Sequence, residues 1–402
     1  MMKALTRVLL LGLCLALLAG TALANEVVDI SSEGYDCFGY TYTLPDGRLL
    51  FTGCHGTPGN YMDSKARILC LNPDRTVSWE YIYPEEGSWD FGGVVLMKDG
   101  TLCVRLTNCP YQRTEEEKLV FFTQDGQLTG REIRLEVRED PTDSIRYRIS
   151  GFGITVCRRA ENEADCYTEY KDWDGNVLFR FSGREPVAAD SVIEEEDGLV
   201  MIGHEQEACG AGTVVKVDWQ GNPVWETVVP FMADANRGAM LQWGEKTSDG
   251  GYLALLLERP NDYSGKKWKT ALVKFSSTGR VLWQNAETFD RLPDSGFFGL
   301  VEYNGKYVLQ FEDKERFASL DMPIRYLWFD LDGNELGITE LSVRKEELPR
   351  LENSRTAAFY MGNMFIMDDG LWGDFTSDND SADHEKQMAS VDTVLVKIPE
   401  LQ

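Results

Sequence analysis

Several features that would point to a function class are missing from this 402-residue sequence. Its 40 Lys and Arg are outnumbered by 66 Asp and Glu, and the formal net charge of −26 argues against binding to nucleic acid or anionic lipid, which need a positive surface. After residues 1–24 no apolar run is long enough to span a bilayer as a helix. There is also no Gly-x-Ser-x-Gly, no His-Glu-x-x-His and no phosphate-binding glycine loop. No sequence motif therefore points to an enzyme.

Residues 1–24 have the pattern of a secretory signal peptide. Lys3 and Arg7 provide the charged start, residues 8–18 are almost entirely apolar, and residues 22–24 read Ala-Leu-Ala, a small-x-small cleavage pattern. We therefore expect a mature chain that begins near Asn25 and is secreted or extracytoplasmic. The alternative is an uncleaved anchor helix.

Eight cysteines remain after the leader, and all lie in the first half of the mature chain. An even number in an exported protein permits disulfides. Cys157 and Cys166 are the best pair, because they flank a short polar loop between two strand-like runs. Cys54 with Cys70, or Cys103 with Cys109, would close similar loops, and eight free thiols are the alternative. No cysteine or histidine spacing is typical of structural zinc.

Turn residues recur at a nearly constant spacing. Glycines that precede an apolar strand lie at positions 47, 100, 151, 198, 250, 305 and 362, so the intervals run from 47 to 57 residues. Many belong to Asp-Gly pairs, which suit tight hairpins because Gly accepts a positive φ. A second turn follows in each unit, and the strand after it often carries an aromatic residue that we expect to pack between units: Trp79, Phe179, Trp225 and Trp283.

This repeat predicts an all-β protein, a seven-bladed β-propeller of four-stranded antiparallel sheets. One sheet of about 50 residues cannot bury both of its faces, whereas seven sheets arranged radially cover each other. The last unit offers only three strands, 356–360, 364–367 and 391–398, so residues 26–30 are expected to supply the fourth and close the ring. Six or eight blades are the alternatives.

We expect a signal peptide over 1–24 and a single propeller domain over 25–402. The expected blades are 37–89, 90–140, 145–187, 188–238, 239–296, 297–351 and 352–402, the last completed by 26–30.

The strand, Asp/Gly turn, strand and Trp pattern resembles the secreted bacterial β-propellers with PQQ-like (quinoprotein-type) repeats. The segments 215–225 and 273–283 carry this pattern most clearly. The resemblance implies a propeller fold and transfers no catalytic residue. Quinoprotein dehydrogenases of this family have eight blades and a vicinal Cys-Cys pair, and neither is present, so no quinone cofactor is expected.

The connections between the second and third strands (B–C connections) are expected to be long and to lie on one face of the ring, where binding sites are common. These connections are 54–65, 108–117, 158–165, 204–212, 258–267, 312–323 and 374–389. All three histidines, His55, His204 and His384, fall in them, which indicates either a metal or acid/base site or three solvated side chains.

Two further groups of candidates lie in these connections. Asp378, Asp380 and Asp383 are oxygen ligands of the kind that calcium prefers, although a solvated acidic loop explains them as well. Five aromatic residues are candidates for stacking on a sugar or peptide, with local packing as the alternative. They are Tyr61, Trp89, Tyr111, Tyr263 and Trp268.

The sequence favours a non-catalytic, exported monomer that binds a protein or carbohydrate through this face, because a repeat scaffold without a catalytic motif supports binding by default. No cofactor is expected beyond calcium. The alternative is a polysaccharide lyase or hydrolase that uses His55, His204 or His384 at the mouth of the ring.

Overall fold

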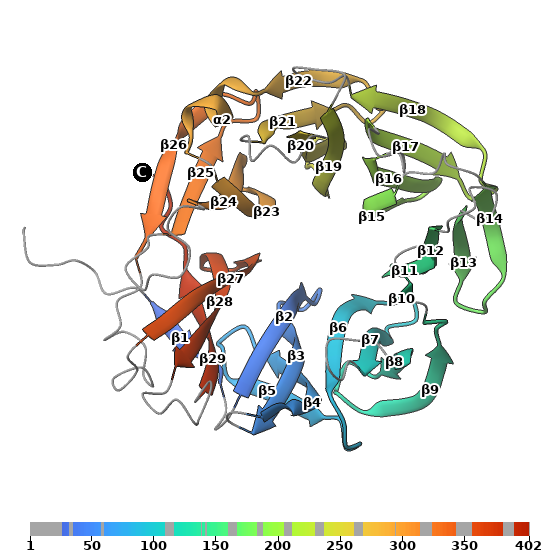
Figure 1. The fold of residues 1–402 in the computed structure, drawn as a ribbon, viewed down its shortest axis with the longest axis vertical. Helices are drawn as coiled ribbons and strands as arrows, with labels where there is room; N and C mark the ends of the chain where they lie inside the picture. The colour runs from blue at the N-terminus through green and yellow to red at the C-terminus, as the bar shows by residue number, and fades with distance from the viewer. Residues whose placement is uncertain are drawn as a thin grey trace, which may run out of the picture.

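The computed structural model describes residues 26–31, 35–57, 60–108, 116–137, 139–140, 143–159, 167–182, 188–204, 211–229, 237–260, 268–293, 295–313, 324–342, 356–380 and 390–401. Antiparallel sheets stand around a central axis as a seven-bladed β-propeller (Figure 1), which confirms the predicted fold class. The predicted signal peptide lies outside the described residues. Within the described ranges, no helix has the length and apolar character needed to cross a membrane.

In each blade the chain runs from the axis outward, strand by strand (Figure 1). Blade 1 holds β2 (Tyr35–Thr43), β3 (Leu49–Thr57), β4 (Asn60–Leu71) and β5 (Val77–Ile82). Blade 2 holds β6 (Trp89–Leu96), β7 (Leu102–Asn108), β8 (Glu116–Phe122) and β9 (Leu128–Arg134). Blade 3 holds β11 (Asp143–Ile149), β12 (Gly153–Arg159), β13 (Tyr167–Asp172) and β14 (Val177–Ser182), with the short β10 (Glu139–Asp140) paired to β11.

The remaining blades follow the same plan. Blade 4 holds β15 (Ala188–Glu195), β16 (Gly198–His204), β17 (Gly212–Asp218) and β18 (Pro223–Val229). Blade 5 holds β19 (Arg237–Lys246), β20 (Tyr252–Pro260), β21 (Lys269–Phe275) and β22 (Val281–Asn285), followed by the short helix α2 (Glu287–Arg291). Blade 6 holds β23 (Ser295–Tyr303), β24 (Lys306–Asp313), β25 (Ile324–Phe329) and β26 (Glu335–Leu341).

Blade 7 is built from both ends of the chain. Its inner strands are β27 (Thr356–Met367), β28 (Gly370–Asp380) and β29 (Ser390–Lys397). The outer strand is β1 (Val27–Asp29), which pairs antiparallel to β29 with Val27 opposite Val396. The prediction that residues 26–30 complete the last blade is therefore confirmed, because pairing leaves no open edge on β29.

One predicted turn and part of one predicted loop are wrong in blade 7. The hairpin between β27 and β28 turns at residues 368–369, whereas Gly362 lies inside β27 at a register shift between Met361 and Met364. The segment expected to form separate strands at 356–360 and 364–367 is this single bulged strand. Residues 374–380, expected in a loop, belong to β28.

Four of the other six predicted turns, at Gly47, Gly100, Gly250 and Gly305, have the backbone that the glycines suggested, whereas Gly151 has no positive φ and Gly198, at φ +158°, begins strand β16. Gly47, Gly100 and Gly250 have φ near +80°, and the Gly47 amide donates to the Leu44 carbonyl at 2.9 Å. Arg75 takes the place of glycine in the outer turn of blade 1 and has φ +67°, a left-handed conformation that side chains rarely adopt. The A–B and C–D turns lie at one end of the blades, and the strand ends that lead into the B–C connections lie at the other end (the loop face).

Aromatic residues of the outermost strands join one blade to the next. The ring of Trp79 in blade 1 lies so close to Gly126 in blade 2 that a Cβ on this glycine would be 2.4 Å from Trp79 Cε3. The same contact joins Phe179 to Gly221, Trp225 to Gly279 and Trp283 to Gly333. Packing between blades, predicted from the repeat, is therefore confirmed for all four aromatic residues.

Candidate functional site

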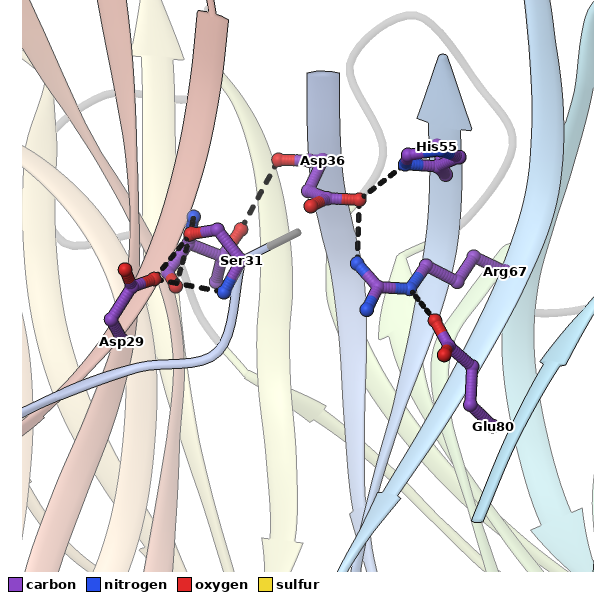
Figure 2. A network of polar contacts seen from close by, with 7 residues as sticks. Asp29, Ser31, Asp36, His55, Arg67 and Glu80 are labelled. Atoms are coloured by element: carbon purple, nitrogen blue, oxygen red, sulfur yellow. Dashed lines mark hydrogen bonds and ion pairs between the residues drawn. The ribbon is translucent and has the colours of Figure 1, made fainter. Parts of the chain in front are cut away.

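The candidate site lies in blade 1, toward the loop face, where one polar side chain from each strand meets the next (Figure 2). Asp36 on β2 is directly opposite His55 on β3. Arg67 on β4 is opposite Gly53, which is two residues before His55 on β3. On its other side Arg67 is opposite Ile82, which is two residues after Glu80 on β5. Because side chains alternate between the faces of a strand, all four side chains point to the same face of the sheet.

Asp36 is the centre of this cluster. Its side chain is 0% exposed and accepts hydrogen bonds from Arg67 Nη1 at 2.6 Å and from His55 Nδ1 at 3.0 Å. Arg67 Nε donates to Glu80 Oε1 at 2.7 Å, and its guanidinium lies 5.2 Å from the centre of the Phe38 ring. Two carboxylates thus share one buried guanidinium, and the surplus negative charge falls beside His55.

The contact with Asp36 orients the imidazole of His55. A carboxylate accepts only, so Nδ1 carries the proton in this hydrogen bond, and Nε2 of the neutral ring then carries the lone pair. The His55 side chain is 25% exposed, which leaves part of the ring accessible to solvent. Such a ring accepts a hydrogen bond from a ligand, or a proton from a substrate, at a fixed position.

A second set of contacts ties the site to the last blade. Ser31 Oγ donates to Asp29 Oδ1 at 2.6 Å and accepts from the Thr393 amide at 3.0 Å. Thr393 Oγ1 in turn donates to the backbone carbonyl of Asp36 at 3.3 Å (Figure 2). The strand that carries Asp36 is therefore held against β29 and the segment that follows β1.

Asp374 forms a separate buried polar contact between the same two blades. Its carboxylate is 1% exposed and accepts from Thr41 Oγ1 of β2 at 2.5 Å and from the backbone amide of Asn363. Burial raises the pKa of Asp374 to about 6, while hydrogen bonds from Thr41 and Asn363 act in the opposite direction. A Cβ on Gly362 would lie 1.5 Å from Asp374 Oδ1, so the bulge in β27 needs glycine there.

The structure separates two of the predicted histidines and leaves the third undescribed. His55 lies near the end of β3 in blade 1, whereas His204 ends β16 in blade 4, across the ring (Figure 1). His384 lies outside the described residues. In the part of the chain that the structure describes, no group of three or more His, Cys, Asp or Glu is placed to hold a metal.

The predicted calcium ligands remain a prediction. Asp378 and Asp380 lie in β28 rather than in a loop, and their side chains are outside the description, as is Asp383. Residues 54–57 and 60–65 are likewise in strands, so the connection expected over 54–65 is shorter than predicted.

The predicted aromatic residues divide into packed and undescribed ones. Trp89 is 2% exposed and packs its ring against Tyr83, with centroids 5.0 Å apart, so local packing explains it and its ring is not available to a ligand. Trp268 is half-buried against the core between blades 5 and 6. The side chains of Tyr61, Tyr111 and Tyr263 lie outside the described residues.

The cysteine predictions have different outcomes. Cys157 lies in β12, and Cys166 lies outside the described residues, so their pairing stays a prediction. Pairing of Cys54 with Cys70 is wrong, because Cys54 is opposite Ala66 while Cys70 is opposite Leu50, four residues farther along the hairpin. Four residues of strand span roughly 13 Å, beyond the reach of a disulfide.

A hollow of about 620 Å³ lies away from this site, between β22, α2 and the outer turn of blade 6. Asn285 Nδ2 donates to the Gly333 carbonyl there at 2.8 Å, and Arg291 pairs with Glu335 at 2.6 Å. The polar groups in these contacts bond to each other, so they are less available to a ligand than the partly exposed imidazole of His55.

Sequence reasoning found His55 but missed Asp36, Arg67 and Glu80. The pairing of the first hairpin is the feature that could have identified Asp36. Counting residue pairs outward from the turn at Gly47 places residue 36 opposite residue 55 only if β2 contains one extra, unpaired residue. The structure places it at Gly39, where the register shifts between Phe38 and Tyr40. Without that bulge the count misses Asp36 by one residue and puts the wrong face toward His55.

No protein-family model matches the chain, and no curated protein matches it. Solved structures match it at low identity. Extracellular domains 1–2 of Drosophila Semaphorin 1a give a TM-score of 0.48 at 9% identity, over 94% of this chain and 88% of that chain. The AfRom2 CNH domain gives 0.45 at 8% identity, over 94% and 100%.

Prolyl oligopeptidase B from Galerina marginata is also similar, with a TM-score of 0.44 and 11% identity over 85% of this chain. The chain spans 46% of the length of that peptidase. These similarities assign no function to the chain, since unrelated functions share one fold.

Proposed function

We propose that this chain is an exported, non-catalytic β-propeller that binds a protein or carbohydrate partner through its loop face. The observation that carries the proposal is the Asp36–His55 pair, an imidazole oriented by a buried carboxylate at 3.0 Å and still 25% exposed. Binding groups fixed on rigid strands lose little entropy when a ligand arrives. The leader-like pattern of residues 1–24 supports export.

The chemistry around His55 favours a neutral or cationic partner. The lone pair on Nε2 accepts a hydrogen bond from a sugar hydroxyl or a peptide N–H. Asp36 and Glu80 outnumber Arg67 in charge, and the chain as a whole carries −26, so an anionic ligand is disfavoured. Tyr61, Tyr111 and Tyr263 remain candidates for stacking, and Asp378, Asp380 and Asp383 remain candidates for calcium.

An enzyme acting on polysaccharide is the second candidate, because a carboxylate that orients a histidine also serves general bases. Of the three histidines expected at such an active site, His55 is the one that this second candidate function keeps. Ser31 is a poor nucleophile for such a mechanism, since its hydroxyl already bonds Asp29 and the Thr393 amide. A site built from His55 and His204 together is disfavoured by their places on opposite sides of the ring.

The test compares His55→Gln with His204→Gln, its matched control near the end of the same strand in blade 4. The chain from residue 25 and both variants are applied to a glycan array, and glycans that bind are titrated. We expect His55→Gln to weaken binding about tenfold, the cost of roughly one good hydrogen bond, and His204→Gln to change it little.

Equal binding by all three proteins would contradict the assignment to His55. Turnover would contradict a non-catalytic role: incubation with alginate or polygalacturonate followed at the absorbance of unsaturated products detects lyase activity, and reducing-sugar release detects hydrolysis. Activity that is present in the unmodified chain and lost in His55→Gln would establish the enzyme alternative.

A further inference from the structure

Two cysteines lie directly opposite each other on the innermost hairpin of blade 1. Cys37 on β2 is the Cα partner of Cys54 on β3, and the next pair is Phe38 with Gly53. Each cysteine is adjacent in the chain to a residue of the candidate site, Asp36 or His55. Because successive side chains alternate, the two thiols share the opposite face of the sheet, which faces blade 2.

A hydrogen bond of a neighbouring residue shows that the face with the two thiols lies against blade 2. Thr52, two residues before Cys54 on the same face, donates its hydroxyl to the Gly92 carbonyl of β6 at 2.5 Å. The thiols therefore lie near the seam between blades 1 and 2, and both are half-buried.

The backbone geometry suits a cross-strand bridge. Directly opposite residues of an antiparallel pair have Cα atoms about 4.5 to 5.5 Å apart, within the range of about 4.4 to 6.8 Å found for disulfides. The two strands also approach closely at this point. A Cβ on Gly53, next to Cys54, would lie 1.9 Å from the Cys37 carbonyl oxygen and 2.7 Å from the Phe38 Cα.

We propose that Cys37 and Cys54 form a reversible cross-strand disulfide behind the Asp36–His55 pair. With a small disulfide such as oxidised glutathione, one cysteine thiolate attacks a glutathione sulfur and releases one glutathione thiolate. The second cysteine then attacks the protein sulfur of this mixed disulfide and releases the other. The protein loses two protons and two electrons, and oxidised glutathione takes up both to become two thiols.

The surroundings set the conditions under which this bridge forms. Burial raises the pKa of the Cys54 thiol well above its ordinary value, and the carboxylate of Asp90 acts in the same direction. The thiolate is the attacking species, so bridge formation is expected to be slow at neutral pH and to accelerate as the pH rises. Once formed, the bridge fixes the two strands that hold Asp36 and His55.

This inference does not depend on the proposed binding function, since it rests on strand pairing alone. The chain from residue 25 is equilibrated with oxidised and reduced glutathione, free thiols are blocked with N-ethylmaleimide, and tryptic peptides are mapped without reduction. Arg48 lies between the two cysteines, so trypsin separates their peptides unless a disulfide links them. We expect one linked peptide pair and loss of alkylation at both Cys37 and Cys54.

The matched control is Cys70→Ser in the same sheet, because Cys70 is opposite Leu50 and Trp79 and has no cysteine across from it. The link is expected to persist in Cys70→Ser and to be lost in Cys37→Ser and in Cys54→Ser. The peptide map of the unmodified chain tests the disulfide directly, so the test still holds if a variant fails to fold. Mixed glutathione adducts without a link, full alkylation of both residues, or a link from either one to another cysteine would overturn the proposal.

Discussion

The seams between successive blades and the seam that closes the ring differ at the outer turn of the blade. Between blades 1 and 2, 3 and 4, 4 and 5, and 5 and 6, an aromatic ring from an outer strand covers a turn glycine of the following blade. Trp79 on Gly126 is one example, and its indole Nε1 also donates to the Gln124 carbonyl at 2.9 Å. At these turns a flat ring fits against a bare backbone, and polar contacts such as Lys246 with Glu195 at 2.8 Å cross the seams elsewhere.

At the closing seam between blades 7 and 1 the glycine is replaced by Arg75. Its guanidinium lies 4.2 Å from the centre of the Trp372 ring and pairs with Glu26 at 2.7 Å and with Asp369. Toward the loop face the same seam carries the Thr393 bond to Asp36, and between them it buries Asp374. An apolar cluster that includes Phe51 and Trp372 still fills its centre.

This contrast follows from how the strands come together. Blades 1 to 6 follow one another along the chain, so the connections between them help to align the apolar fit at each outer turn. The closing seam brings β27, β28 and β29 from the end of the chain against β1 and β2 from its start, and only pairing across the sheet sets the register of β1 on β29. Hydrogen bonds and ion pairs depend on direction, so they specify register better than apolar contact does.

The largest expected effect comes from Arg67→Met, which leaves Asp36 buried without its main counter-charge. Removing one partner of a buried ion pair typically costs about 3 to 5 kcal/mol of unfolding free energy. Arg325→Met is the matched control, because Arg325 pairs with Glu340 at 2.8 Å on the same two strands of blade 6 and is 25% exposed. There we expect a loss of less than about 1 kcal/mol.

Urea unfolding followed by tryptophan fluorescence measures both variants. Equal losses for Arg67→Met and Arg325→Met would show that burial adds nothing to the pair of Arg67 with Asp36. A loss confined to Arg67→Met would confirm that Asp36, buried on the side of blade 1 that meets blade 7, depends on this counter-charge.

Asp374→Asn is expected to change how stability depends on pH. The folded pKa of about 6 lies above the ordinary value of 3.8, so the folded state holds this proton more tightly. The resulting stabilisation is complete below pH 3.8 and is lost as the pH rises through about 6. The variant has no such proton, so its stability relative to the unmodified chain should rise by up to about 3 kcal/mol between pH 4 and pH 7.

Asp90 and Glu245 also have pKa values raised by burial, to about 7 each, and they remain in the variant. The comparison therefore uses the difference between the two proteins at each pH, from urea unfolding at fixed salt. A difference that stays constant with pH would mean that Asp374 titrates in the folded state as it does in the unfolded chain.

The smallest expected effect is a difference in unfolding free energy between two glycine variants at the outer turns. It distinguishes the cost of contact with an aromatic ring from the cost of a strained backbone. Gly126→Ala puts a Cβ 2.4 Å from the Trp79 ring at φ +80°, whereas Gly175→Ala meets nothing within 4 Å at φ +84°. Both variants carry the backbone cost of a left-handed residue, about 1 to 2 kcal/mol. Gly126→Ala should lose a further 1 kcal/mol or more, up to about 3, from overpacking.

Thermal or urea unfolding of the two alanine variants measures this difference. If both lose the same amount, the aromatic ring moves aside without cost, and the description of these seams by steric fit is refuted.

Much of the fold was readable from the sequence, because propeller turns are local. Gly47 and Gly100 could be identified from the Asp-Gly pair alone, and Arg75 from its place in the repeat. Residues 26–30 followed from counting strands. Gly362 misled the count, because its role is to make room for the Asp374 carboxylate, a contact with the following strand that no local pattern shows.

The candidate site was less predictable for the same reason. His55 was conspicuous because histidine is rare in this chain, but its partners are ordinary charged residues in a sequence rich in them. Asp36 meets His55 only through a bulged register, and Arg67 reaches Asp36 diagonally across β3. Residues 374–380 were read as a loop because polar residues dominate them, although β28 pairs on both sides there.

The pairing of Val27 with Val396 has a consequence for how the molecule is made. β1 is synthesised well before its partner β29, so the two strands can pair only after the residues between them have been added. Closing so large a loop costs little more than closing a short one, since the entropy grows only with the logarithm of length, yet such distant contacts make folding slow. Until they meet, β29 is an open sheet edge, so completion of the circle is the step most exposed to mispairing.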